Sequence, residues 1–128
     1  MSDLDQRIAE LHERLGGVQK RLGGVLLKAW SVAARQAAAE ARRKSAAHEK
    51  ARGDHLRPIV RGEATGAKQQ EHADAANEHG NAASHYADAA EHYKAGDMKE
   101  GKFSEGQGDH FRASANRMSA KLKVPPAR

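Results

Sequence analysis

The histidines of this chain recur in a duplicated motif, and they are the residues best suited to chemistry. His72-Ala-Asp-Ala-Ala-Asn-Glu-His79 is followed thirteen positions later by His85-Tyr-Ala-Asp-Ala-Ala-Glu-His92. Imidazole rings bind transition metals and exchange protons near neutral pH. The alanines between them are the strongest helix formers. The motif therefore poses a choice between a metal or active site and the packing face of a helical bundle.

The second copy of the motif carries a weak metal signature. His85, Asp88 and His92 are spaced three and four residues apart, so adjacent pairs share one polar face of a helix. A zinc site needs three or four ligands, and no second helix repeats this pattern. We keep these three residues as weak metal candidates, favour a solvated polar face, and predict no cofactor.

The first copy points to the opposite side of the same helix. On a helical wheel His72 and His79 lie about 20° apart. They share that face with alanines and tyrosines, namely Ala76, Ala83, Ala87, Ala90, Tyr86 and Tyr93. We favour neutral imidazoles packed in an alanine groove, each with a hydrogen bond to a neighbouring helix. The alternative is a ligand pair that faces histidines on other helices, such as His48 or His110.

An apolar seam marks the N-terminal segment, residues 1–24. Its residues follow a 4-3-4-3-4-3 spacing, which predicts an amphipathic helix that self-associates as a coiled coil: Leu4, Ile8, Leu11, Leu15, Val18, Leu22 and Val25. Ser2 or Asp3 can cap its start. A Gly-Gly pair occurs twice on the outer face, and each glycine costs about 1 kcal/mol relative to alanine. We expect a break or kink near residues 16–24; the alternative is the close approach of another backbone.

Positive charge is concentrated between residues 14 and 61, and negative charge between 62 and 110. The basic series is the candidate surface for an anionic partner: Lys28, Arg35, Arg42, Arg43, Lys44, Lys50, Arg52, Arg57 and Arg61. One interpretation is a solvated face that the acidic helix neutralises. The other is contact with nucleic acid, anionic lipid or an acidic protein.

The remaining helix-ending and helix-capping residues predict an all-α fold, an antiparallel three- or four-helix bundle of long alanine-rich helices. The bundle spans residues 25–122, with helices at about 25–52, 67–95 and 98–122 and a tail at 123–128. Gly53 and Pro58 should end the first helix in a loop over 53–66. Gly96 ends the next helix, and Asp97 with Glu100 forms a capping box that starts the last. The short connection requires an antiparallel hairpin, and a break near residues 104–108 is an alternative.

Several function classes lack their sequence signals. There is no cysteine and no nucleophile-elbow, phosphate-loop, dinucleotide or zinc-protease motif, so we expect no enzyme and no small-molecule substrate. No apolar run approaches the length of a membrane span, and the acidic start lacks the apolar core of a secretory signal. We expect a protein of the bacterial cytoplasm, or one delivered by a virion or a secretion system without a cleavable signal.

The run Ala83-x-His-Tyr-x-x-Ala-Ala-x-His-Tyr-x-Ala-Gly-Asp97, continuing to His110, resembles a group of bacterial and phage proteins with Ala/His-rich helical hairpins of the form A-A-x-H-H-x-x-G-[DN]. The resemblance covers residues 72–112 and implies a helical hairpin. The chain departs from it by placing glycines where alanines are expected, at Gly101, Gly106 and Gly108.

The chain also resembles, by its charge placement, the four-helix membrane-localisation domains of bacterial toxins and effectors. Those bind anionic lipid through a basic tip, and the corresponding places here hold Lys20, Arg21, Lys94 and Lys99. Taken together, we expect a non-enzymatic helical-bundle interaction or structural protein from a phage or mobile element. Its partners would be protein, including copies of itself; the alternatives are a binder of nucleic acid or phospholipid and a metal-binding bundle.

Overall fold

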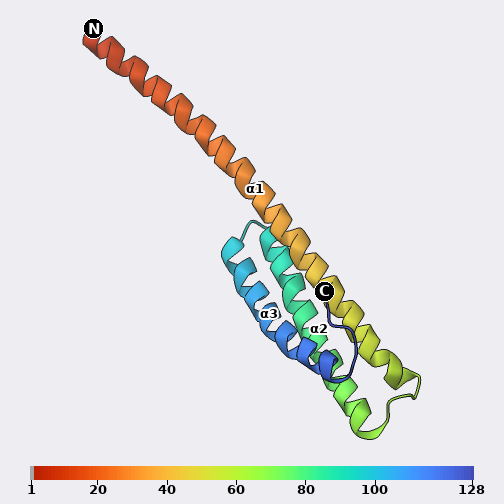
Figure 1. Ribbon diagram of the computed structural model, residues 1–128. Coiled ribbons are helices and arrows are strands. Elements are labelled where there is room, and N and C mark those ends of the chain that lie inside the picture. Colours follow the sequence, from red (N-terminus) through yellow and green to blue (C-terminus); the bar gives the residue numbers. More distant parts are fainter. Residues whose placement is uncertain (1) are drawn as a thin grey trace. The chain divides into compact units, whose positions relative to one another are not determined.

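The computed structural model describes the backbone of residues 2–128 and the side chains of residues 2–24 and 31–128. Over that backbone the chain is all-α, with helices α1 (Asp3–Val60), α2 (Gly66–Lys94) and α3 (Met98–Lys121) and no strand (Figure 1). The chain divides into two compact units, residues 1–33 and residues 34–128. The second unit is a helical bundle, which confirms the predicted fold class.

The start of α1 is capped as the sequence suggested, by Ser2. Its hydroxyl accepts a hydrogen bond from the Asp5 amide at 3.2 Å and donates one to the Asp5 carboxylate at 2.9 Å. The bond from the Asp5 amide satisfies a donor that a helix start otherwise leaves to water, and the Asp5 charge favours the positive end of the helix dipole.

Helix α1 runs without interruption through residues 16–24, so the predicted break is wrong. Nothing lies within 4 Å of the Cβ position of Gly16, Gly17, Gly23 or Gly24, so no other part of the same chain approaches these glycines closely. A break would leave backbone amides and carbonyls without partners on both sides. No Ser, Thr, Asp or Asn stands between residues 15 and 24 to cap a new start. The glycine cost is therefore smaller than the cost of interruption.

Helix α1 also continues past Gly53 to Val60, and the predicted loop over 53–66 is wrong in its first half. Pro58 lies in the last turn, where it forfeits only the bond to the carbonyl of Asp54. The Pro58 carbonyl then accepts the amides of Glu63 and Ala64 at 2.9 and 3.1 Å, with Gly62 at a φ of 71°. This later end places His55 on the helix.

The α2–α3 hairpin forms as predicted. Gly96 ends α2 with a φ of 84°, and the Asp97 amide donates to the His92 carbonyl at 2.9 Å. The Asp97 side chain then accepts the Glu100 amide at 3.2 Å and starts α3. Helix α3 passes through residues 104–108 without a break.

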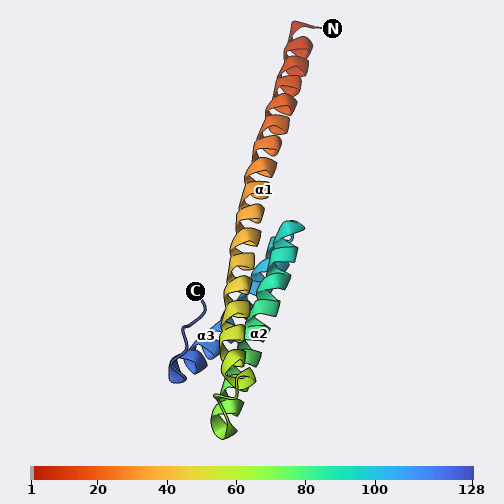
Figure 2. The same ribbon diagram turned by 90° about the vertical axis from the view of Figure 1, so that its right-hand side faces the viewer.

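Residues spaced seven apart line the interior of the second unit, where α2 and α3 run beside residues 34–60 of α1 (Figures 1 and 2). Each helix contributes one series of buried residues: Ala34, Ala41, His48 and His55 on α1; His72, His79, Tyr86 and Tyr93 on α2; Gly101, Gly108 and Ala115 on α3. The tyrosine rings lie against the glycines, Tyr86 on Gly108 and Tyr93 on Gly101. Small residues on α3 therefore make room for the large rings of α2.

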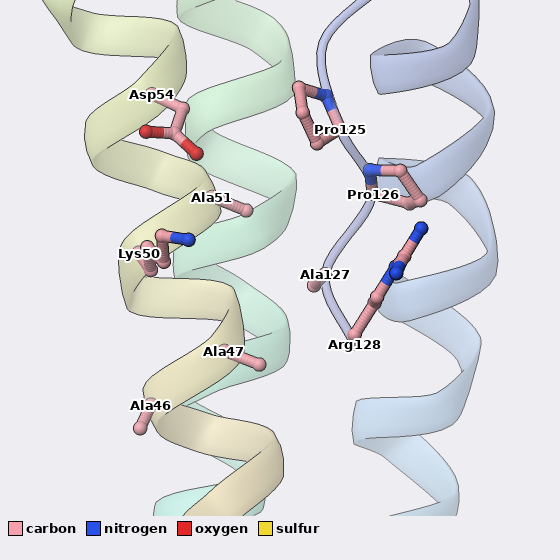
Figure 3. Close-up of a pocket in the computed structure, with 9 residues that line it drawn as sticks. All are labelled: Ala46, Ala47, Lys50, Ala51, Asp54, Pro125, Pro126, Ala127 and Arg128. Carbon is pink, nitrogen blue, oxygen red and sulfur yellow. The ribbon is translucent and has the colours of Figure 1, made fainter.

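The C-terminal tail packs on the bundle rather than lying beyond it. Ala127 is buried, and its amide donates to the Asn116 side chain at 3.1 Å. A cavity of about 610 Å³ lies between the tail and the face of α1 that carries Lys50 and Asp54 (Figure 3).

Candidate functional site

Four histidines gather inside the second unit, two from α1 and two from α2. The exposed fractions of His48, His55 and His79 are 1% or less, and that of His72 is 9%. Each pair is seven residues apart on its own helix, so both rings of a pair point to the same side. The face-sharing predicted for His72 and His79 is thus realised, and the residues they meet are His55 and His48.

A continuous chain of hydrogen bonds links the four rings through one hydroxyl. The Nδ1 atoms of His48 and His79 are 2.8 Å apart, and those of His55 and His72 are 3.0 Å apart. The Oγ atom of Ser119, on α3, lies 2.8 Å from Nε2 of His79 and 2.8 Å from Nε2 of His55. We call these five residues the histidine network.

The network can satisfy its contacts with every ring neutral. A neutral imidazole carries one N–H donor and one bare nitrogen, and a serine hydroxyl donates once and accepts. Four neutral rings and one hydroxyl thus carry one more proton than the four hydrogen bonds of the network require. Within the described side chains, no buried nitrogen or oxygen lacks a partner.

The surroundings favour the neutral form of His48, His55 and His79. Burial, with a contribution from the nearby Arg112, lowers the pKa of His48 to about 4. Burial, followed by the neighbouring rings of His48 and His55, lowers the pKa of His79 to about 4. The pKa of His55 is lowered as well, by burial and by His72, against an opposing effect of Asp54. Desolvation penalises the charged imidazolium in each case.

The network resembles catalytic chemistry in only one respect, a serine hydroxyl beside histidine nitrogens. A serine nucleophile needs such a base, but it also needs access to its substrate. The exposed fraction of Ser119 is 0%. The arrangement instead joins all three helices and fixes their register.

A second cluster of hydrogen-bonded polar side chains lies at the other end of the interior of the second unit. The Tyr93 hydroxyl donates to Glu105 at 2.6 Å, and Lys44 donates to the other oxygen of that carboxylate at 2.9 Å. Burial alone would raise the pKa of Glu105, but these two hydrogen bonds outweigh it and the pKa is lowered. The Tyr86 hydroxyl donates to Asp109 at 2.5 Å, and the Lys44 ammonium lies 5.4 Å from the centre of the Tyr86 ring.

The weak metal candidates do not come together as a ligand set. His85 stacks on Phe111, with ring centres 5.3 Å apart and planes 7° apart. Asp88 is exposed and His92 is half-buried on the same face. Among the side chains that the structure describes, no group of three metal-binding residues is arranged to hold an ion.

Three of the nine residues of the basic series pair with acidic neighbours on α1 itself. Arg43, Arg52 and Arg57 each form an ion pair with an acid three residues earlier, at Glu40, Glu49 and Asp54. Arg42 reaches the acidic helix α2, where its guanidinium lies 4.0 Å from Glu91. Lys44 belongs to the interior group, and Arg35 also has an interaction partner. Lys50 and Arg61 are exposed, and the side chain of Lys28 lies outside the described residues.

The apolar seam is the largest uncovered apolar feature of the described side chains. Its six described members have exposed fractions between 42% and 66%: Leu4, Ile8, Leu11, Leu15, Val18 and Leu22. The side chain of Val25, the seventh predicted member, lies outside the described residues. Within residues 2–24, every residue except Gly16 and Gly23 is exposed.

Sequence reasoning missed His55 and Ser119 as network members. Gly53 and Pro58, which flank His55, predict a loop at that position. The seven-residue spacing of His48 and His55 matches that of His72 and His79, and this signal could have placed it. Nothing in the sequence distinguishes Ser119 from other serines, because its role depends on the register of α3 against both other helices.

The comparisons with known proteins return no relative. No family model, curated protein or solved structure matches the chain. Within the described part of the chain, no helix has both the length and the apolar content that a membrane crossing requires.

Proposed function

We propose that this protein is a non-enzymatic helical interaction module that self-associates through the apolar seam, with the bundle of residues 34–128 as its folded body. The observation that carries the proposal is the exposure of Leu4, Ile8, Leu11, Leu15, Val18 and Leu22 on a helix. Contiguous apolar patches on soluble proteins mark interaction surfaces.

The energetics of the seam support an occupant. Burying a Leu, Ile or Val side chain contributes about 1.5–3 kcal/mol. Leaving six such side chains in water is therefore costly. The helix that carries them also contains four glycines, so it has little stability of its own without a partner. Their spacing over three heptads fits another helix of the same kind.

A second copy of the chain is the occupant that the seam fits best. The heptad pattern is self-complementary, because each apolar layer finds an identical layer in another copy. The glycine pairs lie on the outer face, away from the seam. They therefore leave the apolar contact uninterrupted.

The test is the mass of the full chain in solution as a function of concentration. Wild-type protein should exceed the monomer mass of 13.8 kDa in sedimentation or light scattering at about 100 μM and dissociate on dilution. Leu11→Glu should raise the dissociation constant at least about 100-fold, since each copy loses an apolar contact and gains a charge there.

Ala9→Glu is the matched control, because it adds the same charge on the outer side of the same helix turn. Ala9 and Leu11 are both exposed in the single chain, so neither change disturbs the fold of the monomer. Wild-type protein that stays at monomer mass at about 100 μM would refute self-association.

Binding of an anionic surface by the basic series is the second candidate. Exposed ion pairs contribute only about 0–1 kcal/mol, so a row of phosphates could displace the acids from Arg43, Arg52 and Arg57. The exposure of Lys50 and Arg61 supports it. DNA mobility shift and liposome pelleting should then show binding that weakens between about 50 and 200 mM salt. Absence of binding in both assays at the lower salt would refute this candidate.

A further inference from the structure

The residues that flank the apolar seam carry information about how two copies would meet. In heptad notation Ile8, Leu15 and Leu22 occupy the a positions, and Leu4, Leu11 and Val18 occupy the d positions. The residue before each a, position g, and the residue after each d, position e, border the contact between helices. Their charges set the orientation of the partner.

Arginine occupies every g position of the described seam. Arg7, Arg14 and Arg21 are all exposed. No ion pair joins any of them to an acid among the described side chains; Arg21 donates only to the backbone carbonyl of Gly17, at 3.4 Å. The e positions hold Asp5, His12 and Gln19, which offer one carboxylate at the extreme end.

An antiparallel pair would bring these arginines together, because g faces g in that orientation. With Leu11 opposite Leu15 of the second copy, Arg14 faces Arg14 and Arg7 faces Arg21. With Leu11 opposite Leu22 of the second copy, Arg14 faces Arg21. Both antiparallel registers therefore place like charges beside a desolvated seam, where repulsion is weakly screened.

A parallel, in-register pair avoids these contacts. In that orientation each g faces the e position of the next heptad in the other copy. Arg7 then meets His12, and Arg14 meets Gln19, so no two arginines are forced together. Every apolar layer meets itself, Leu11 against Leu11 and Leu15 against Leu15.

One feature of the segment favours the opposite orientation. All of its acids precede residue 14, namely Asp3, Asp5, Glu10 and Glu13. Apart from Arg7, its arginines and lysines come after these acids, at Arg14, Lys20 and Arg21. End-to-end attraction would align these halves antiparallel. However, Glu10, Glu13 and Lys20 lie on the outer heptad positions, where solvent and salt screen charges beyond about 8–10 Å. The direct g contacts at the seam outweigh this effect.

We propose, resting on the self-association proposed above, that two copies of this chain join along residues 4–22 as a parallel, in-register coiled coil, with orientation set by Arg7, Arg14 and Arg21. The partner surface is thus the apolar seam of a second copy, whose helix runs in the same direction.

The absence of cysteine from the chain allows a direct test with single-cysteine variants of the full-length protein. Leu11→Cys places a thiol opposite itself only in the parallel, in-register pair. Mild oxidation should link these copies about tenfold or more faster than copies carrying Ala9→Cys, because association raises the effective thiol concentration to about the millimolar range. Ala9 lies on the outer face and reports random collisions.

Two mixtures test the antiparallel registers. Leu4→Cys mixed with Leu22→Cys reports one register, and Leu11→Cys mixed with Leu22→Cys reports the other. Mass spectrometry of the linked peptides should find only disulfides between identical positions. A dominant mixed disulfide would overturn the parallel arrangement while leaving self-association intact. Monomeric wild-type protein under reducing conditions would instead overturn the self-association itself.

Discussion

His48 and His79 share a hydrogen bond between their Nδ1 atoms, 2.8 Å apart, although both side chains are almost completely buried. Two imidazoles can share such a bond only when one donates and the other accepts. The contact therefore requires that only one of the two Nδ1 atoms carries a proton. This condition makes the stability of the bundle depend on pH in a specific window.

Lowering the pH from about 6.5 to 5 should destabilise the bundle. In the unfolded chain the imidazoles titrate near 6.5, whereas folding lowers the pKa of His48 and His79 to about 4 and also lowers that of His55. The unfolded state thus binds protons first as pH falls. Stability is fully present above about pH 6.5 and is lost toward pH 4, by up to about 1.4 kcal/mol per pH unit for each ring.

Urea denaturation followed by circular dichroism measures this slope. The Leu11→Glu background keeps the chain monomeric and removes any concentration dependence. Glu105 acts in the same direction as the histidines but at lower pH, since its lowered pKa gives stability that is present above pH 4.5 and is lost only at more acidic pH. A free energy of unfolding that stays constant from about pH 7 to 5 would contradict neutral buried rings.

Ser119→Ala should destabilise the bundle by about 1–3 kcal/mol, because it leaves buried ring nitrogens of His55 and His79 facing a methyl group. Alanine is the better helix former, so the loss must come from the lost hydrogen bonds. Ser114→Ala on the same helix is the control and should change stability by less than about 0.5 kcal/mol. Equal effects of the two substitutions would show that the shared hydroxyl has no special role.

Gly108→Ala should destabilise the bundle by about 1–3 kcal/mol through overpacking. Its new Cβ would lie 2.7 Å from Cε1 of Tyr86, a ring with no exposed surface. Gly101→Ala meets the Tyr93 ring more closely still and should cost at least as much. Gly106→Ala, on the same helix with nothing within 4 Å, should instead stabilise by about 1 kcal/mol. Thermal melts of the three variants check these opposite signs.

The α2–α3 hairpin was predictable because its signals are local. Gly96 and Asp97 end one helix and start the next through contacts within a few residues. The two-sided character of α2 follows from helical periodicity alone, and the tyrosines and first-copy histidines lie on the buried side as predicted.

The error at residues 53–60 of α1 has the opposite cause, because contacts with other helices outweigh the local residues that favour a helix end. Gly53 and Pro58 favour a helix end, yet the helix continues and carries His55 into contact with His72 and Ser119. These partners come from other helices and cannot be read from a segment of α1. The same holds for the network as a whole, because its geometry depends on the register of three helices.

Gly17→Ala and Gly24→Ala should each stabilise α1, by about 1 kcal/mol, since both glycines are helical, exposed and free of contacts at the Cβ position. Amide hydrogen exchange in the full chain should slow across residues 16–24, and self-association should tighten because the helix loses less freedom on pairing. Gly96→Ala is the matched contrast. Its φ of 84° is a left-handed conformation, so the added Cβ should cost about 1–2 kcal/mol. If Gly17→Ala were destabilising like Gly96→Ala, the chain would turn at residues 16–24 and the apolar seam would not be a continuous surface.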